Sequence, residues 1–421
     1  MTAPQTAKLN KPRACDDARP TAPVMMPEPD LRLAEELVMA LLALPGGSCH
    51  EAEVLAFVRG KLLQAGVSES SLSCDQTHRR SPAGGEIGNL ICKLPGTVAG
   101  GRRLLMAHLD TVPLCAGARP VRRGDLIVPA DKNTALGADD RAGVAVVLAT
   151  VLQIVAQDLP HPPLTLFWTV QEELGLYGAR YASLGALGKP RLAFNFDGGS
   201  PEKVVVGATG GYRMAIQVEG VASHAGAAPE KGVSAIAIAA LAVADLQKDG
   251  WHGRIVKQGH VGTSNVGVFH GGDATNVVTP RVEIRAEARS HEPAFRQKIV
   301  KTIERAFQRA ARQVRNAQGV CGKVQIDGRL DYEAFALPWD DPSVLAAETA
   351  IRAGGGDPQR AISNGGLDAN WISARGIPTV TLGCGQVNPH TPEERLDLAQ
   401  FRQACRIALR LATGVEGCPA D

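Results

Sequence analysis

Hydrophobic residues along the chain follow two spacings, one that predicts helices and one that predicts buried strands. Leucines recur at helical spacing at positions 31, 33, 37, 41 and 42, and residues 50–66 repeat this pattern. Two short apolar runs, "RRLLMAHLDTV" and "PLTLFWTVQEE", instead end in polar residues, which is typical of buried strands with functional ends. Between these two runs, residues 141–157 predict a long apolar helix.

A third run of the same kind, "RLAFNFDGG", continues the alternation of strands and helices. Strand, helix, strand, helix and strand in succession predict an α/β fold with a doubly wound sheet. In such a sheet, ligands bind at the carboxyl ends of the strands. We therefore look for chemistry first at the polar ends of these three runs.

The pattern changes near residue 208, where strands of period two are joined by helices predicted at 233–246 and 293–314. Strands interrupted by two helices predict a small α+β layer. After Pro338 the α/β pattern returns, with a helix near 342–353, a short strand and a final amphipathic helix.

A chain of 421 residues is too long for one ordinary core, so two domains are expected. The change of pattern predicts that the smaller one is inserted into the larger. We expect a flexible tail at 1–27, a larger domain formed by 28–208 and 336–421, and an inserted domain at 209–335.

The segment "KVVVGATGG", residues 203–211, looks like the strand and glycine-rich turn of a dinucleotide-binding fingerprint. That fingerprint requires a helix directly after the turn. A period-two pattern follows here, so we interpret the segment as a hinge between the two domains. Its glycines would give the chain the freedom to turn.

Composition excludes several classes of partner. A formal net charge of +2 and an aromatic content of 4% argue against nucleic acid and against an anionic membrane surface. No run of apolar residues is long enough to span a membrane, and the first 23 residues lack the apolar core of a signal peptide. Nine cysteines without a C-x-x-C pair favour a reducing compartment, so we expect a cytoplasmic protein.

Five places carry a side chain capable of binding metal at the end of an apolar strand or in the turn after it. Each has a structural alternative, such as helix capping by an aspartate or a turn before two glycines. Taken together, they are better explained by one site at the rim of the sheet. These residues are His108, Asp139, the pair Glu172 and Glu173, Asp197 and His390.

Imidazole and carboxylate ligands without a nearby thiolate suit two Zn²⁺ ions, with Co²⁺ or Mn²⁺ as substitutes. His108 and Asp110 lie two apart on a strand, so both point to the same side, and Asp110 can hold the imidazole in one tautomer. Of Glu172 and Glu173, at most one is expected to point well at the metals. The other then remains free to act as a general base.

Seven motifs occur in order along the chain: "HLDTVP", "GADDRAGVA", "QEELGLYGA", "FDGG", "SHAG", "TNVVTP" and "NPHTPEE". Together they resemble the M20 family of di-zinc metallopeptidases. The "GADDRAGVA", "GGLDAN" and "LGCGQVNPHT" segments are most similar to its peptidase T-like branch. The resemblance covers nearly all the chain from about residue 28 and implies a di-metal catalytic domain with a smaller inserted lid domain.

The resemblance also implies a role for each candidate residue. His108, Asp139 and Asp197 would hold one metal, and Asp139, Glu173 and His390 the other. Asp110 would orient His108, and Glu172 would activate the water. The family's spacing to a Lys, here Arg141, selects Asp139 over Asp140 as the bridging acid. It also implies a cis peptide between Asp139 and Asp140, with Asp140 capping the helix.

In the lid, the resemblance implies that His224 stabilises the oxyanion, often from the partner subunit of a homodimer. Asn276 and Arg289 match positions that contact the substrate's carbonyl or carboxylate. For His224 and Asn276 the structural alternative is a loop-capping role. The chain departs from the family at Arg141, where Lys is commoner, and at Pro389, before His390.

The function expected from the resemblance is hydrolysis of amide bonds in small substrates. The favoured reaction is that of an exopeptidase, aminopeptidase- or tripeptidase-like, acting on short peptides. Alternatives are an N-acyl amino acid deacylase or a carbamoyl-type amidase, which family resemblance alone does not separate. A ligand-binding homologue without catalysis is a third hypothesis, which the intact Glu172 disfavours.

Overall fold

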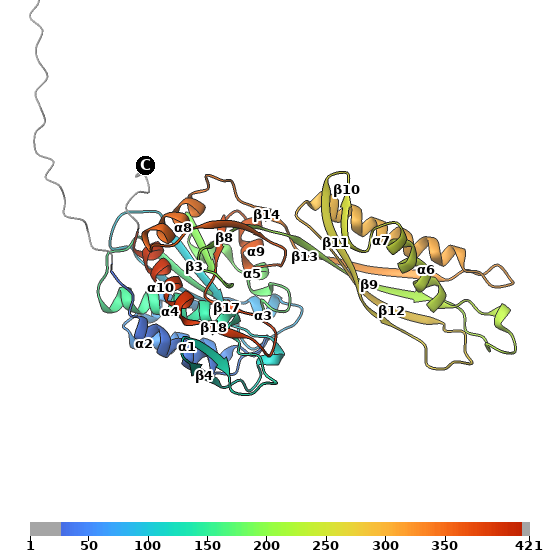
Figure 1. The fold of residues 1–421 in the computed structure, drawn as a ribbon, viewed down its shortest axis with the longest axis horizontal. Coiled ribbons are helices and arrows are strands. Elements are labelled where there is room, and N and C mark those ends of the chain that lie inside the picture. Colours follow the sequence, from blue (N-terminus) through green and yellow to red (C-terminus); the bar gives the residue numbers. More distant parts are fainter. Residues whose placement is uncertain (1–26, 415–421) are drawn as a thin grey trace, which may run out of the picture.

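The apolar runs of the sequence form the middle of a nine-stranded mixed sheet in the computed structural model, which describes residues 27–414 (Figure 1). The expected tail at 1–27 lies outside the described residues, apart from Pro27. The strand order is β1 (Leu72–Cys74), β2 (Leu90–Leu94), β6 (Leu164–Thr169), β3 (Arg103–His108), β7 (Leu192–Phe196), β16 (Thr379–Leu382), β8 (Lys203–Ala208) and β14 (Phe335–Ala336), and β15 (Gln359–Ser363) also pairs with β8.

Four neighbouring strands of this sheet are parallel, because β3 pairs in parallel with both β6 and β7, and β7 with β16. Their carboxyl ends therefore meet at one edge. Helices cover both faces, as a doubly wound sheet requires, so the predicted α/β fold class is confirmed. On one face lie α1 (Leu31–Leu42), α2 (Ala52–Gln64), α4 (Ala138–Ala156), α8 (Pro342–Ala353) and α10 (Leu398–Thr413), and on the other α3 (Thr77–Arg80), α5 (Tyr177–Tyr181) and α9 (Asp368–Ala374).

Helix α4 is the centre of the larger core. All but three of its residues are buried, and helices from both ends of the chain, α1 and α10, pack against it (Figure 1). This explains why its sequence is apolar on every side and not only along one stripe. The helix predicted at 141–157 is therefore confirmed. Although α4 includes Ala138, the backbone of Asp139 and Asp140 is not helical, so the regular helix begins at Arg141.

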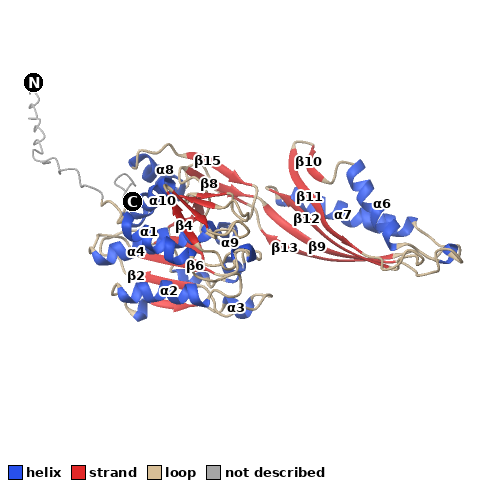
Figure 2. Cartoon of the chain, turned by 60° about the horizontal axis from the view of Figure 1, so that its bottom comes forward, coloured by secondary structure: helices blue, strands red, loops and turns tan. Residues whose placement is uncertain are grey.

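A second, five-stranded antiparallel sheet begins directly after β8. Its order is β10 (Gly253–Lys257), β11 (His260–His270), β12 (Arg281–Ser290), β9 (Gly210–Glu219) and β13 (Lys323–Tyr332). Helices α6 (Ala235–Lys248) and α7 (Pro293–Gln313) cover one face of it (Figure 2), with a core of their own. Strand β9 alternates buried and exposed residues, as its period-two sequence predicts.

The "KVVVGATGG" segment forms the whole of β8, Thr209 and the start of β9, and no helix follows it. The rejection of a dinucleotide fingerprint is thus confirmed. A four-stranded sheet of β17 (Gln386–Val387), β18 (Arg395–Asp397), β5 (Leu126–Pro129) and β4 (Pro120–Arg123) was not predicted. None of the helices in residues 27–414 is long and apolar enough to cross a membrane.

The division into a larger domain and an inserted one leads to a prediction. Phe307 is 0% exposed in the core under the five-stranded sheet, so Phe307→Ala should lower the free energy of unfolding of that unit by about 3–5 kcal/mol. Hydrogen exchange should then quicken between residues 210 and 332 but not in β3 or β6. Phe269→Ala, at a side chain 44% exposed, is the control and should change little. Equal quickening throughout the chain would contradict two independent units.

Candidate metal centre

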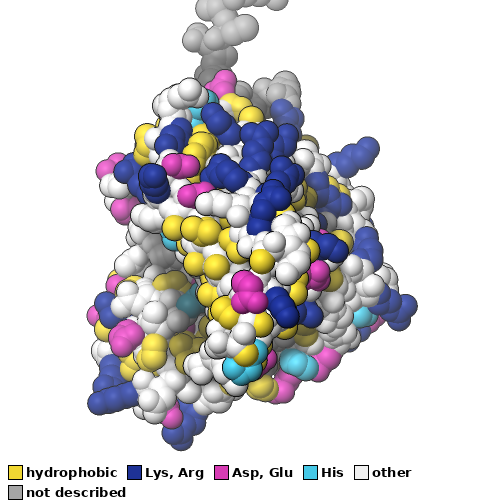
Figure 3. All heavy atoms as spheres, turned by 90° about the vertical axis from the view of Figure 1, so that its right-hand side faces the viewer, with side chains coloured by type: hydrophobic (Ala, Val, Ile, Leu, Met, Phe, Trp, Pro, Cys, Tyr) yellow, Lys and Arg dark blue, Asp and Glu magenta, His cyan; other side chains and the backbone are white. Residues whose placement is uncertain are grey.

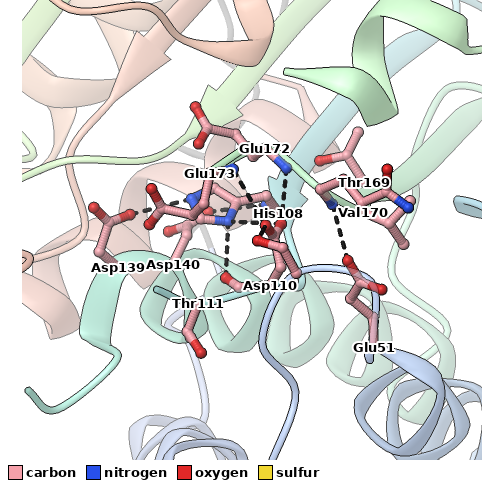
Figure 4. A network of polar contacts seen from close by, with 12 residues as sticks. Glu51, His108, Asp110, Thr111, Asp139, Asp140, Thr169, Val170, Glu172 and Glu173 are labelled. Atoms are coloured by element: carbon pink, nitrogen blue, oxygen red, sulfur yellow. Dashed lines mark hydrogen bonds and ion pairs between the residues drawn. The ribbon is translucent and has the colours of Figure 1, made fainter. Parts of the chain in front are cut away.

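The carboxyl ends of β3, β6 and β7 bring the candidate residues to one place. His108 is the last residue of β3, Glu172 and Glu173 follow β6 by three and four residues, and Asp197 follows β7 directly. Figure 4 shows the side chains of His108, Asp139 and Glu173 close together at this edge. The loop that carries His390 returns to the same place from the C-terminal part of the chain.

The Asp139 carboxylate lies between two imidazoles. Its Oδ1 is 3.1 Å from Nε2 of His108, and its Oδ2 is 3.2 Å from Nε2 of His390. Nε2 of His390 is also 2.8 Å from Oε1 of Glu173. One carboxylate therefore turns its two oxygens towards two different candidate ligands, as a bridging ligand between two metal ions would.

Asp110 is completely buried and organises the residues around it. Nδ1 of His108 is 3.0 Å from the Asp110 carbonyl oxygen and 3.5 Å from its Oδ1. The backbone N–H groups of Glu172 and Glu173 donate to Oδ1 and Oδ2 of Asp110, at 2.9 and 3.2 Å. One carboxylate thus fixes both the end of β3 and the turn after β6.

Asp140 has both oxygens engaged within the protein. Oδ2 accepts from the backbone N–H of His108 at 3.1 Å, and Oδ1 accepts from the N–H of Gly143 and from Nε2 of Gln386, at 3.1 and 2.8 Å. The expected cis peptide between Asp139 and Asp140 is present, and the expected cap on the helix is made by Asp140. Gly143 is required because a Cβ there would lie 2.0 Å from the carbonyl oxygen of Phe196.

Burial and mutual repulsion shift the pKa values of these groups. Burial, and then the charge of Asp139, raises the pKa of Asp197 to about 7. Burial also raises the pKa of Glu173. Hydrogen bonds with Asp139 and Glu173 raise the pKa of His390 to about 10, and burial opposes this. Asp197 and Glu173 therefore favour the neutral form unless a positive charge lies near them.

The donor set fits divalent metal ions. Ligand atoms of His108, Asp139 and Glu173 lie within 4.8 Å of one another, as do those of His108, Asp140 and Asp197. The second group contains Asp140 in place of the expected Asp139. The oxygens of Asp140 already accept three hydrogen bonds. We therefore infer that Asp140 stabilises the site and does not bind a metal ion. Cations would relieve the repulsion among the remaining carboxylates.

Glu172 differs from its neighbour Glu173. Its carboxylate makes no hydrogen bond among the described residues, and in Figure 4 it points away from Asp110. Burial raises its pKa well above the ordinary value, which the charge of His108 opposes. A carboxyl group that makes no such hydrogen bond and favours its protonated form is suited to transferring protons.

A cavity of about 200 Å³ opens beside Asp139 and Asp197. Glycines 198, 199 and 383 line it, together with Lys203, Ser363 and Pro389. The small residues at the end of β7 leave room for a ligand next to the carboxylates.

The structure places His224 and Asn276 far from the metal centre of their own chain. His224 follows the far end of β9, where its Nδ1 accepts from the N–H groups of Gly226 and Ala227, at 3.1 and 3.0 Å. Asn276 lies beside it, because its carbonyl oxygen accepts from Ala225 N–H. The ten residues of β9 span about 30 Å, so neither reaches Asp139 of its own chain.

Arg289 lies at the opposite end of the lid sheet, opposite Gly211 at the start of β9. Its Nε and Nη2 donate to the two carboxylate oxygens of Glu287, both at 3.0 Å. The fork that was expected to bind a substrate carboxylate is thus paired with an acid of its own strand.

Two residues of the site were missed in the sequence. Glu394 is 1% exposed and accepts the N–H groups of Leu136, Gly137 and Asp139, at 2.9, 2.8 and 3.0 Å. Gln386 donates to Asp140. Glu394 stands inside the quoted motif "NPHTPEE", but its role depends on a turn more than 250 residues away, which no local pattern reveals.

Comparison with known proteins agrees with this geometry. A family model described as peptidase family M20/M25/M40 matches residues 104–414. An uncharacterised protein of Bacillus subtilis strain 168, YqjE, is 31% identical over 90% of this chain and 97% of its own length.

Two solved structures are similar over nearly their whole length. A tripeptidase from Staphylococcus aureus has a TM-score of 0.83 at 28% identity, covering 92% of this chain and 99% of that one. The aminopeptidase PepT from Bacillus cereus has a TM-score of 0.80 at 31% identity, covering 91% and 98%.

Removing the Glu394 carboxylate should destabilise the protein. In Glu394→Ala three N–H groups around Asp139 lose their acceptor, and we expect the free energy of unfolding to fall by about 2–4 kcal/mol. Urea unfolding of chelator-treated protein measures this. The control is Glu393→Ala, an exposed neighbour. The same midpoint for both variants would refute the role of Glu394.

The raised pKa values predict how the chelator-treated protein responds to pH. Asp197, with a pKa of about 7, and His390, with a pKa of about 10, bind a proton more tightly in the folded state than in the unfolded state. Their stabilising contribution is complete below the unfolded pKa and is lost as the pH rises through the folded value. Stability without metal should therefore fall between about pH 5 and pH 9, and added Zn²⁺ should reverse the trend. Thermal unfolding across this range tests it, and a rise in stability without metal would be the contrary result.

Proposed function

The chain belongs to peptidase family M20/M25/M40, as its motifs predict, and from that membership we propose that it is a metal-dependent exopeptidase of short peptides. The placement of Asp139 between His108 and His390, with an unpaired Glu172 beside them, carries this proposal. The similar structures from S. aureus and B. cereus are named as a tripeptidase and an aminopeptidase, which supports short peptides as substrates.

We propose two divalent ions at this site, preferably Zn²⁺, with Co²⁺ or Mn²⁺ as substitutes. His108, Asp139 and Asp197 would hold one, and Asp139, Glu173 and His390 the other. Bound there, the ions would polarise the substrate carbonyl and lower the pKa of a water molecule. Asp110 fixes the ring of His108 and, through two N–H groups, the direction of Glu172 and Glu173.

Glu172 acts as the general base. Its unpaired carboxylate takes a proton from the attacking water, and the same carboxylic acid then gives the proton to the leaving amine. Burial favours the protonated form of Glu172, so taking the proton from the water costs less than it would for an exposed carboxylate. The cavity beside Asp139 and Asp197 receives the substrate.

For the lid we propose a role through a second copy of the chain. His224 lies too far from its own metal centre, so a homodimer through the lid would place it in the partner's site, where it would stabilise the oxyanion. Apolar side chains gather over the face at the free end of the lid (Figure 3), and Ile236 and Val277 are exposed there. Asn276 beside His224, and Arg289, once released from Glu287, are proposed to contact substrate.

We also propose a cytoplasmic location. The cysteines within the described residues are all free thiols, which supports a reducing compartment.

The proposal is tested with Glu172→Ala. The variant should keep two metal ions per chain, measured by elemental analysis, and lose turnover by roughly 10²- to 10⁴-fold or more. The substrates are a panel of dipeptides, tripeptides, N-acyl amino acids and N-carbamoyl amino acids, with each of the three metals added. Wild-type turnover by the variant would refute the role of Glu172. Preference for N-acyl or N-carbamoyl substrates would indicate a deacylase or an amidase, and metal binding without any turnover would indicate a ligand-binding protein.

A further inference from the structure

A short loop from the N-terminal part of the chain lies directly under the residues proposed to do the chemistry. Residues 43–51 connect α1 to α2, and Gly46, Cys49 and Glu51 form hydrogen bonds with residues far away in the sequence. In Figure 4 Glu51 points at the chain segment that leads from Val170 to Glu172. We propose that the Gly46–Glu51 loop positions the Gln171–Glu173 turn for catalysis, with Ser48 and Glu51 as the positioning residues.

Glu51 joins two turns through one oxygen. Its Oε1 accepts from the N–H of Cys49 at 2.9 Å and from the N–H of Gln171 at 3.0 Å. Cys49 and Gln171 both have a left-handed backbone, with φ of 75° and 57°. Side chains other than glycine rarely adopt this conformation without support, so the carboxylate of Glu51 helps hold both turns.

The Gln171 side chain is anchored as well. Its Nε2 donates to the carbonyl oxygen of Gly84 at 2.6 Å, and its Oε1 accepts from Oγ of Ser81 at 2.5 Å. Gln171 immediately precedes the general base and the proposed ligand Glu173. A change in its backbone would therefore redirect both carboxylates.

Ser48 acts on the same turn from the other side. Its Oγ donates to Oδ2 of Asp110 at 2.6 Å. That oxygen also accepts the N–H of Glu173, and Oδ1 accepts the N–H of Glu172. The three consecutive N–H groups of residues 171–173 thus donate to two carboxylates. Glu51 belongs to the loop, and Asp110 is held by Ser48 of the loop.

Two further contacts fix the loop itself. Nη2 of the buried Arg141 donates to the Gly46 carbonyl oxygen at 3.1 Å, and Gly47 forms a bridge with Thr111. A Cβ on Gly46 would lie 2.5 Å from that nitrogen and 2.8 Å from Cγ2 of Val54, so the close packing favours glycine. The loop is therefore attached to the segments that follow β3 and begin α4, as well as to the turn after β6.

Stability alone does not account for Glu51. The residue is 0% exposed, and its Oε2 has no hydrogen-bond partner among the described residues. Burying a carboxyl group in this way costs free energy that an apolar side chain would avoid. Glu51 lowers stability, yet it holds the turn that carries the general base. Its presence is therefore better explained by a role in positioning this turn.

The test rests on the proposed function and compares Glu51→Ala, Glu51→Gln and Ser48→Ala in the metal-loaded full chain. Glu51→Ala should lower kcat by roughly ten- to hundredfold with KM within about threefold, because the turn is misplaced and not the substrate cavity. Glu51→Gln keeps an oxygen that accepts both N–H groups, so its kcat should recover to within about threefold of wild type. Ser48→Ala should lower kcat by roughly tenfold. Glu53→Ala, an exposed acid of α2, is the control.

Hydrogen exchange of peptides covering 167–176 gives a readout that does not depend on activity. Exchange should quicken in Glu51→Ala and return to the wild-type rate in Glu51→Gln. Wild-type kcat and exchange in Glu51→Ala would overturn the proposal, as would a defect that Glu51→Gln fails to rescue. If the wild-type chain hydrolyses no peptide, the proposed function fails, and the exchange rates alone then decide whether the loop positions the turn.

Discussion

The candidate site depends on holding several carboxylates close together in a buried pocket. Asp139, Asp197 and Glu173 repel one another, and burial adds to the cost of ionising each of them. The chain offsets this with imidazoles on both sides of Asp139 and with backbone N–H groups aimed at Asp110 and at Glu394. What repulsion remains is the reason that the pocket is suited to divalent cations.

The fold supplies this arrangement through strand ends. Because β3, β6 and β7 are adjacent and parallel, residues separated by up to 89 positions, from His108 to Asp197, meet at one edge. Helix α4 then approaches so closely that only glycine fits at position 143. Loops from the beginning and the end of the chain complete the site, with His390 and Glu394 on one of them.

The sequence predicted those features that follow from local pattern. The apolar runs located β3, β6 and β7, and the apolar helix located α4, so the fold class and the gathering of His108, Asp139, Glu173 and Asp197 were within reach. The four-stranded sheet was missed because its strands have two to four residues and no clear alternation. Gln386, Glu394 and Glu51 were missed because each acts on a turn that is distant in the sequence. The family resemblance assigned a role to His224. No local pattern predicted that His224 lies beyond the far end of β9, a strand about 30 Å long.

One measurement tests the central claim most directly. Crystals of the full chain grown with Zn²⁺ should be recorded at wavelengths on either side of the zinc absorption edge. Two anomalous peaks should flank the Asp139 carboxylate, one beside His108 and Asp197 and the other beside Glu173 and His390. A single peak, or peaks remote from Asp139, would contradict the account.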